Sequence, residues 1–105
     1  MSLESNRLLL ALEKALRDIN RETINPEFDQ LSIQDLSPVL NLVARCRADY
    51  LKELFAIATE FPDSLPPAAR ISSFSEIRSR YEELVSASQA LETAIERGYL
   101  DVTPN

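Results

Sequence analysis

Apolar side chains recur at alternating steps of three and four residues along three segments of this chain, and that periodicity restricts its fold more than any other feature. The clearest repeat has six members: Ile77, Tyr81, Leu84, Ser88, Leu91 and Ile95. An α-helix brings such positions onto one face, as in the seam of a coiled coil. We predict a helix over about 73–97, with Ser73 and Glu76 forming a capping box and Gly98 as the left-handed residue after the last turn.

The N-terminal segment predicts a second amphipathic helix, over about 3–22. At about 100° per residue, seven side chains form its core stripe: Ser5, Leu8, Leu9, Leu12, Ala15, Leu16 and Ile19. Leu3 and Leu10 fall on the opposite face, among the basic residues. They are interpreted either as isolated exposed leucines or as part of a second packed surface, which the tail or another subunit would cover.

The middle segment predicts the most apolar helix, over about 38–61. Ser37 can cap its first turn, Pro38 suits the first helical position, and Pro62 stops it. Its apolar arc covers more than half of the helix circumference: Val39, Leu40, Val43, Cys46, Tyr50, Leu51, Leu54, Ile57, Ala58 and Phe61. As the most apolar helix it is expected to be central. Its arc is wider than two neighbouring helices need to cover, so a partner would bury the excess.

Together these segments predict an all-α fold: an up-down three-helix bundle with one short extra helical turn near 26–31, which dimerisation could complete. The loop near 62–72 is rich in proline and should be extended. The chain has 105 residues and no domain linker, so 1–105 is expected to be a single domain. The first connection could also cross the bundle, which would leave the first two helices parallel.

Composition narrows the function classes. The net charge of −6 opposes binding to nucleic acid or to an anionic membrane, so neither is expected as a partner. With no histidine, one cysteine and one glycine, the chain offers no transition-metal site and no phosphate-binding loop. We predict no catalytic residue and no cofactor. A single cysteine and the lack of a signal-peptide core favour the cytoplasm.

Arg47 is the residue that the helical pattern does not explain. Arg45 falls on the solvent side, where Asp49 can pair with it, but Arg47 lies within the apolar arc. An arginine cannot lose its charge and needs a partner or water. It could extend to solvent or pair with a carboxylate of Glu22, Glu27, Asp29 or Asp35, it could face another subunit, or it could bind an anion inside the protein.

These observations favour a protein–protein interaction or assembly module, a homodimer or a bundle that docks another protein. The candidate interface residues are Arg47, Leu10, Leu3 and Tyr50, the last of which shares the apolar arc with Arg47. The alternative is a small all-helical enzyme or sensor that binds an anionic dicarboxylate ligand through Arg47. A second cation beside Arg47 in a closed pocket would distinguish the alternative from the favoured function.

Overall fold

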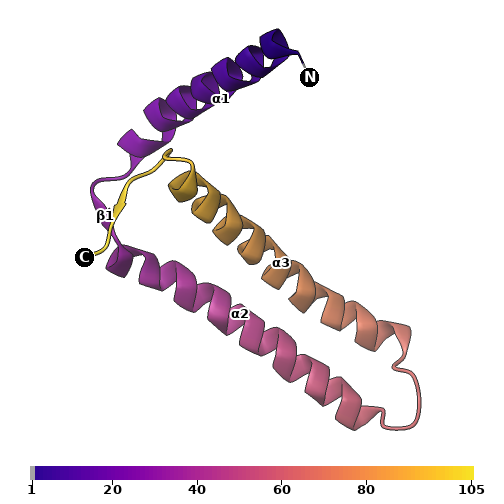
Figure 1. Cartoon of the computed structure of the whole chain (residues 1–105). Coiled ribbons are helices and arrows are strands. Elements are labelled where there is room, and N and C mark those ends of the chain that lie inside the picture. The colour runs from indigo at the N-terminus through magenta and orange to yellow at the C-terminus, as the bar shows by residue number, and fades with distance from the viewer. Residues whose placement is uncertain (1) are drawn as a thin grey trace. The chain divides into compact units, whose positions relative to one another are not determined.

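A computed structural model describes residues 2–105 (Figure 1). Its elements are, in chain order, α1 (Leu3–Ile24), the 3-10 turn η1 (Asn25–Glu27), β1 (Leu31–Ser32), α2 (Ile33–Glu60), α3 (Ala68–Glu96) and β2 (Val102–Thr103). The predicted all-α class is confirmed, because three long helices hold most of the described residues. The chain divides into two compact units, one made of residues 2–36 and 91–105 and the other of residues 37–90.

The second unit is a helical hairpin in which α2 and α3 run side by side in opposite directions (Figure 1). The α3 face that packs on α2 is the seam predicted from the sequence, and its members in this unit are half-buried. Tyr50 of α2 stacks on both Phe74 and Tyr81 of α3, with ring centroids 4.9 and 5.3 Å apart. Val43 and Ile57 of α2 are buried. Packing of apolar and aromatic side chains therefore holds this hairpin together.

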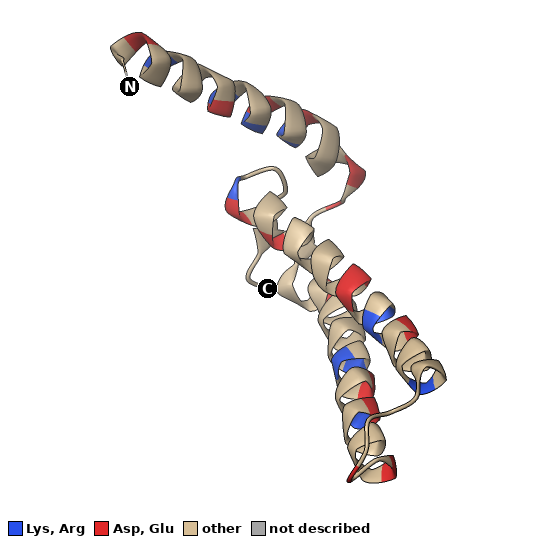
Figure 2. Cartoon of the chain, turned by 90° about the vertical axis from the view of Figure 1, so that its right-hand side faces the viewer, with Lys and Arg blue, Asp and Glu red and all other residues tan. Residues whose placement is uncertain are grey.

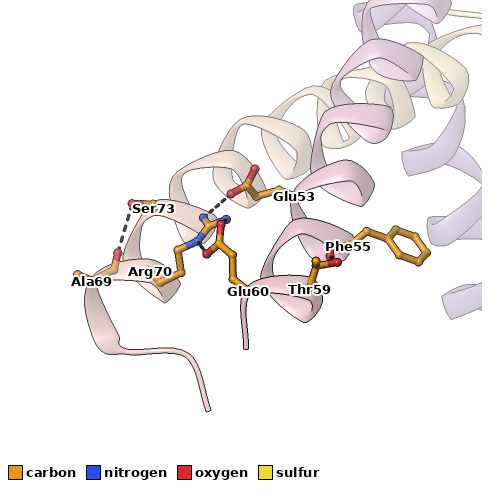
Figure 3. Close-up of polar contacts among 7 residues, drawn as sticks. All are labelled: Glu53, Phe55, Thr59, Glu60, Ala69, Arg70 and Ser73. Carbon is orange, nitrogen blue, oxygen red and sulfur yellow. Dashed lines mark hydrogen bonds and ion pairs between the residues drawn. The ribbon is translucent and has the colours of Figure 1, made fainter. Parts of the chain in front are cut away.

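An ion-pair cluster ties the two helices near their connection (Figure 3). The guanidinium of Arg70 pairs with both Glu53 and Glu60, and its Nε lies 2.8 Å from Oε2 of Glu60. The hydrogen bond from Arg70 holds the pKa of Glu60 below its ordinary value of 4.5. The cluster lies beside the turn and fixes how α3 enters the hairpin.

The first unit is closed by the C-terminal segment. Gly98 has a φ of 74°, the left-handed conformation predicted for it. The amide of Tyr99 donates to the carbonyl of Ala94 at 2.8 Å, and the amide of Gly98 donates to the carbonyl of Ile95 at 3.2 Å. These two hydrogen bonds form a Schellman cap. The chain then turns back and buries Leu100. β2 pairs in parallel with β1, Val102 opposite Leu31, a contact that the sequence did not predict.

Three helix boundaries differ from those predicted. α2 begins at Ile33, before the predicted Pro38, because Ser32 and Asp35 form a capping box: the Ser32 amide donates to Oδ2 of Asp35 at 2.7 Å. α3 begins at Ala68, and Ser73 lies inside it, donating to the carbonyl of Ala69 at 3.2 Å rather than capping. The turn predicted near 26–31 is divided between η1 and β1.

We predict that removing core volume at Ile57 destabilises the hairpin. Ile57 is only 7% exposed, so Ile57→Ala should lower the free energy of unfolding by about 2 to 4 kcal/mol through lost burial and a residual cavity. The matched control is Leu65→Ala in the connection, where the side chain is 90% exposed, and its effect should stay within about 0.5 kcal/mol. Urea unfolding followed by circular dichroism measures both. Equal effects would contradict the assigned core.

We also predict that the Arg70 cluster stabilises the fold at neutral pH and not in acid. Because the folded-state pKa of Glu60 is lowered, its contribution is present above its ordinary pKa of 4.5 and is lost as the pH falls through the lowered value. Arg70→Gln should therefore be less stable than wild type at pH 7, and the difference should shrink towards about pH 2, where Glu60 is protonated. Arg78→Gln, which breaks the exposed pair with Glu82, should have a smaller effect. A difference that is independent of pH would refute this assignment.

Candidate interaction surface

α2 carries two adjacent apolar seams, and α3 covers one of them. The seam that faces α3 consists of Val39, Val43, Cys46, Tyr50, Glu53 and Ile57, all buried or half-buried. The other seam, which we call the open seam, also repeats at steps of three and four and consists of Leu40, Ala44, Arg47, Leu51, Leu54 and Ala58. Every member of the open seam is exposed. A row of this spacing, apolar except for Arg47, is typical of a surface that packs against another helix.

The leucines of the open seam are about half exposed. Leu40, Leu51 and Leu54 are 56%, 48% and 49% exposed. Phe55 lies beside the open seam, is 72% exposed and points away from α3 (Figure 3). Single exposed leucines are common on soluble proteins, but four large apolar residues along one helix form a patch. This patch is the candidate interaction surface.

Arg47 lies in the middle of the open seam and is held by an aromatic residue. Its Nε donates to the Tyr81 hydroxyl at 3.2 Å, and its guanidinium carbon lies 5.7 Å from the centre of that ring. Within the second unit, no ion pair joins Arg47 to a carboxylate. The predicted partners Glu22, Glu27, Asp29 and Asp35 belong to the first unit, so that pairing stays a prediction. The side chain is exposed. Tyr81 therefore orients the guanidinium while leaving its charge without a counter-ion.

The other charged residues of α2 lie outside the open seam, on the remaining faces of the helix. The basic residues Arg45 and Lys52 lie further round the helix, roughly 120 to 140° from the centre of the open seam at about 100° per residue. Neither forms an ion pair within the described part of the chain. The sequence suggested Asp49 as a partner of Arg45. Instead, Oδ2 of Asp49 lies 3.7 Å from Nη1 of Arg80 on α3. Because Glu53 and Glu60 pair with Arg70, the acidic residues of the hairpin part of α2 are directed towards α3. The open seam itself thus contains one cation, Arg47, and no carboxylate.

The apolar stripe predicted for the N-terminal helix lies on α1, and no residue of α1 is buried. Leu8, Leu9, Leu12, Leu16 and Ile19 are all exposed. Leu3 and Leu10, on the opposite face, are exposed as well. Figure 2 marks the basic and acidic positions along α1 in blue and red. The first unit, taken by itself, leaves this stripe without a partner.

The opposite face of α1 is anchored to the C-terminal segment. Arg21 donates through Nη1 to the carbonyl of Gly98 at 2.9 Å, and it forms a bidentate pair with Asp101 at 2.9 and 2.6 Å. The hydrogen bond from Arg21 lowers the pKa of Asp101, whose amide in turn donates to Oδ1 of Asn25 at 3.1 Å. Arg21 lies about 180° from the centre of the apolar stripe. These contacts anchor the polar face of α1 to the C-terminal segment, and Leu16 of the stripe lines a cleft together with Tyr99 of that segment.

Two clefts lie in the first unit, and neither includes Arg47. One, of about 400 Å³, is lined by Glu13, Leu16, Arg17, Glu96, Arg97 and Tyr99. The other, of about 250 Å³, is lined by Ile33, Leu36, Ile95, Val102, Thr103 and Pro104. Tyr50, a candidate interface residue, lies half-buried between Phe74 and Tyr81. Neither of these two clefts therefore provides a binding pocket at Arg47.

Within residues 2–105, no group of three or more acidic or cysteine side chains is placed to hold a metal ion. No helix among them has the length and hydrophobicity needed to cross a bilayer. Comparisons with protein-family models, with curated proteins and with solved structures find no match to the chain. The exposed seam of α2, with Arg47 in its centre, and the exposed stripe of α1 are the surfaces of this chain that suggest a function.

Proposed function

We propose that this protein is an assembly module that associates with itself through the open seam of α2, as a homodimer. The observation that supports the proposal is the row of exposed leucines, centred on an arginine without a carboxylate partner. Interfaces combine a buried apolar centre with arginine more often than with lysine. The catalytic alternative, a dicarboxylate site at Arg47, is less favoured because neither of the two described clefts includes Arg47.

Self-association would complete the three-helix bundle that the sequence predicts. α2 and α3 supply two antiparallel helices, and a third helix on the open seam would complete the core of an up-down bundle. Full burial of a leucine contributes about 1.5 to 3 kcal/mol. The three leucines of the open seam therefore provide a substantial driving force for association. We place this module in the cytoplasm because the chain has a single cysteine.

We predict that the wild type sediments at equilibrium as a dimer, with twice the monomer mass of 11.8 kDa, at concentrations near 10 μM. Leu51→Glu should shift it to monomer, because a carboxylate would have to be buried in an apolar contact. Arg47→Ala should weaken association by about 2 to 5 kcal/mol, because a carboxylate of the partner would lose its counter-ion.

The matched control is Leu65→Glu, which places the same charge in the exposed connection and should leave the mass unchanged. A wild-type mass of 11.8 kDa at these concentrations would end the proposal. A dimer that Leu51→Glu does not disturb would show that self-association uses another surface. If only Arg47→Ala had no effect, the open seam would stand and Arg47 would be a residue at its edge that extends to solvent.

A further inference from the structure

We propose that the contacts of Arg21 with Asp101 and with the carbonyl of Gly98 form a clamp that fixes the direction of α1 within the first unit. Opening this clamp lets the helix turn about the connection at residues 25–30. The clamp lies within a single chain, so it does not depend on the proposed self-association. It controls the direction in which the apolar stripe of α1 is presented.

α1 is held only near its C-terminal end. None of its residues is buried, and its half-buried residues, apart from Ser5, lie in the last two turns: Asp18, Asn20, Arg21 and Ile24. One turn earlier, Leu16 and Arg17 are exposed and line a cleft of about 400 Å³ with Tyr99. Little apolar surface is buried between α1 and the rest of the first unit, so apolar packing contributes little to its direction.

Arg21 makes the polar contacts that take the place of such packing. Its Nη1 donates to the Gly98 carbonyl and to Oδ1 of Asp101, both at 2.9 Å, and its Nη2 donates to Oδ2 of Asp101 at 2.6 Å. A planar guanidinium that bonds both oxygens of one carboxylate fixes orientation as well as distance. These three hydrogen bonds from one side chain therefore resist rotation of α1.

The C-terminal segment on the other side of the clamp is held by contacts of its own. The Schellman cap at Gly98 joins it to α3, and the side chain of Leu100 is only 3% exposed. β2 also pairs with β1, which follows the connection at residues 25–30. Because none of these contacts involves Arg21, opening the clamp moves α1 and leaves the C-terminal segment in place.

The connection between α1 and β1 has the properties of a hinge. Residues 26–30 are exposed, and Gln30 has a φ of 39°, in the left-handed region that residues other than glycine adopt only at a cost. Hinges are formed by a few loop residues that absorb changes in backbone dihedral angles. A return of Gln30 to negative φ would release this strain and change the direction in which α1 leaves the connection.

The clamp is in contact with water, so ionic strength should control it. The side chains of Arg21 and Asp101 are 43% and 64% exposed. Dissolved salt weakens ion pairs in such positions. The direction of α1 is thus set by a contact that responds to the solution, whereas the buried Leu100 and the backbone pairing of the C-terminal segment do not depend on charge.

The test measures a distance within the first unit by double electron–electron resonance. Spin labels are attached at Arg7→Cys on α1 and Glu92→Cys on α3, both exposed positions, in full chains in which Cys46 is replaced by alanine. Labelled chains are diluted with unlabelled protein, so that each distance lies within one chain. We expect one narrow distance peak at low salt and a broad distribution in 1 M salt, where the Debye length is about 3 Å.

Two substitutions open the clamp at low salt. Arg21→Gln and Asp101→Asn should each replace the narrow peak by a broad distribution, the first more completely because it also removes the bond to Gly98. The double variant should be no broader than Arg21→Gln, because both changes remove the same contact. The matched control is Lys14→Gln, which breaks the exposed pair with Asp18 inside α1 and should leave the peak narrow.

Several results would overturn the proposal. An unchanged peak in Arg21→Gln would show that other contacts fix α1, and a broad wild-type distribution at low salt would show that nothing fixes it. Broadening in Arg21→Gln but not in Asp101→Asn would show that the ion pair is not the clamp. Loss of helical circular dichroism in Arg21→Gln would mean that the contact maintains the helix itself. A wild-type peak that stays narrow in 1 M salt would overturn the control by ionic strength.

Discussion

The structure depends on how much of the apolar surface of α2 is covered. α2 carries two adjacent seams, and α3 covers only one of them. Burying the first seam holds the hairpin together through Val43, Tyr50 and Ile57. The second leaves leucines in water, at a loss of about 1.5 to 3 kcal/mol for each side chain that could be buried. A hairpin of this composition is therefore stabilised by any helix that supplies an apolar stripe of equal length, and α1 carries one.

The polar contacts of the first unit determine which face of α1 is available. Gly98 ends α3 and lets the chain reverse, so that Leu100 is buried and Asp101 reaches Arg21. Since Arg21 lies opposite the leucines of α1, its ion pair with Asp101 also orients those leucines. A few local contacts at the end of α3 thus couple the closing of the first unit to the exposure of its apolar stripe.

The sequence predicted what depends on local periodicity, and it failed where distant residues meet. The seam of α3 and the role of Gly98 follow from spacing and from backbone preference, and both were predicted correctly. The start of α2 was misplaced because two capping signals compete: the box at Ser32 and Asp35 prevails, and Pro38 then removes only one hydrogen bond near the helix start. The β1–β2 pair and the contact between Arg47 and Tyr81 join residues far apart in sequence, which periodicity does not reveal.

The interaction of Arg47 with Tyr81 also explains how an apolar seam can remain selective. A seam made only of leucine and alanine would accept many amphipathic helices and would promote aggregation. A guanidinium in its centre makes any helix that lacks a carboxylate at that level bury an unpaired charge, which is strongly unfavourable. Tyr81 limits the positions of the guanidinium, so the carboxylate must approach from the open side. A helix that carries a carboxylate at that level meets this requirement, and a helix that carries lysine or arginine there does not.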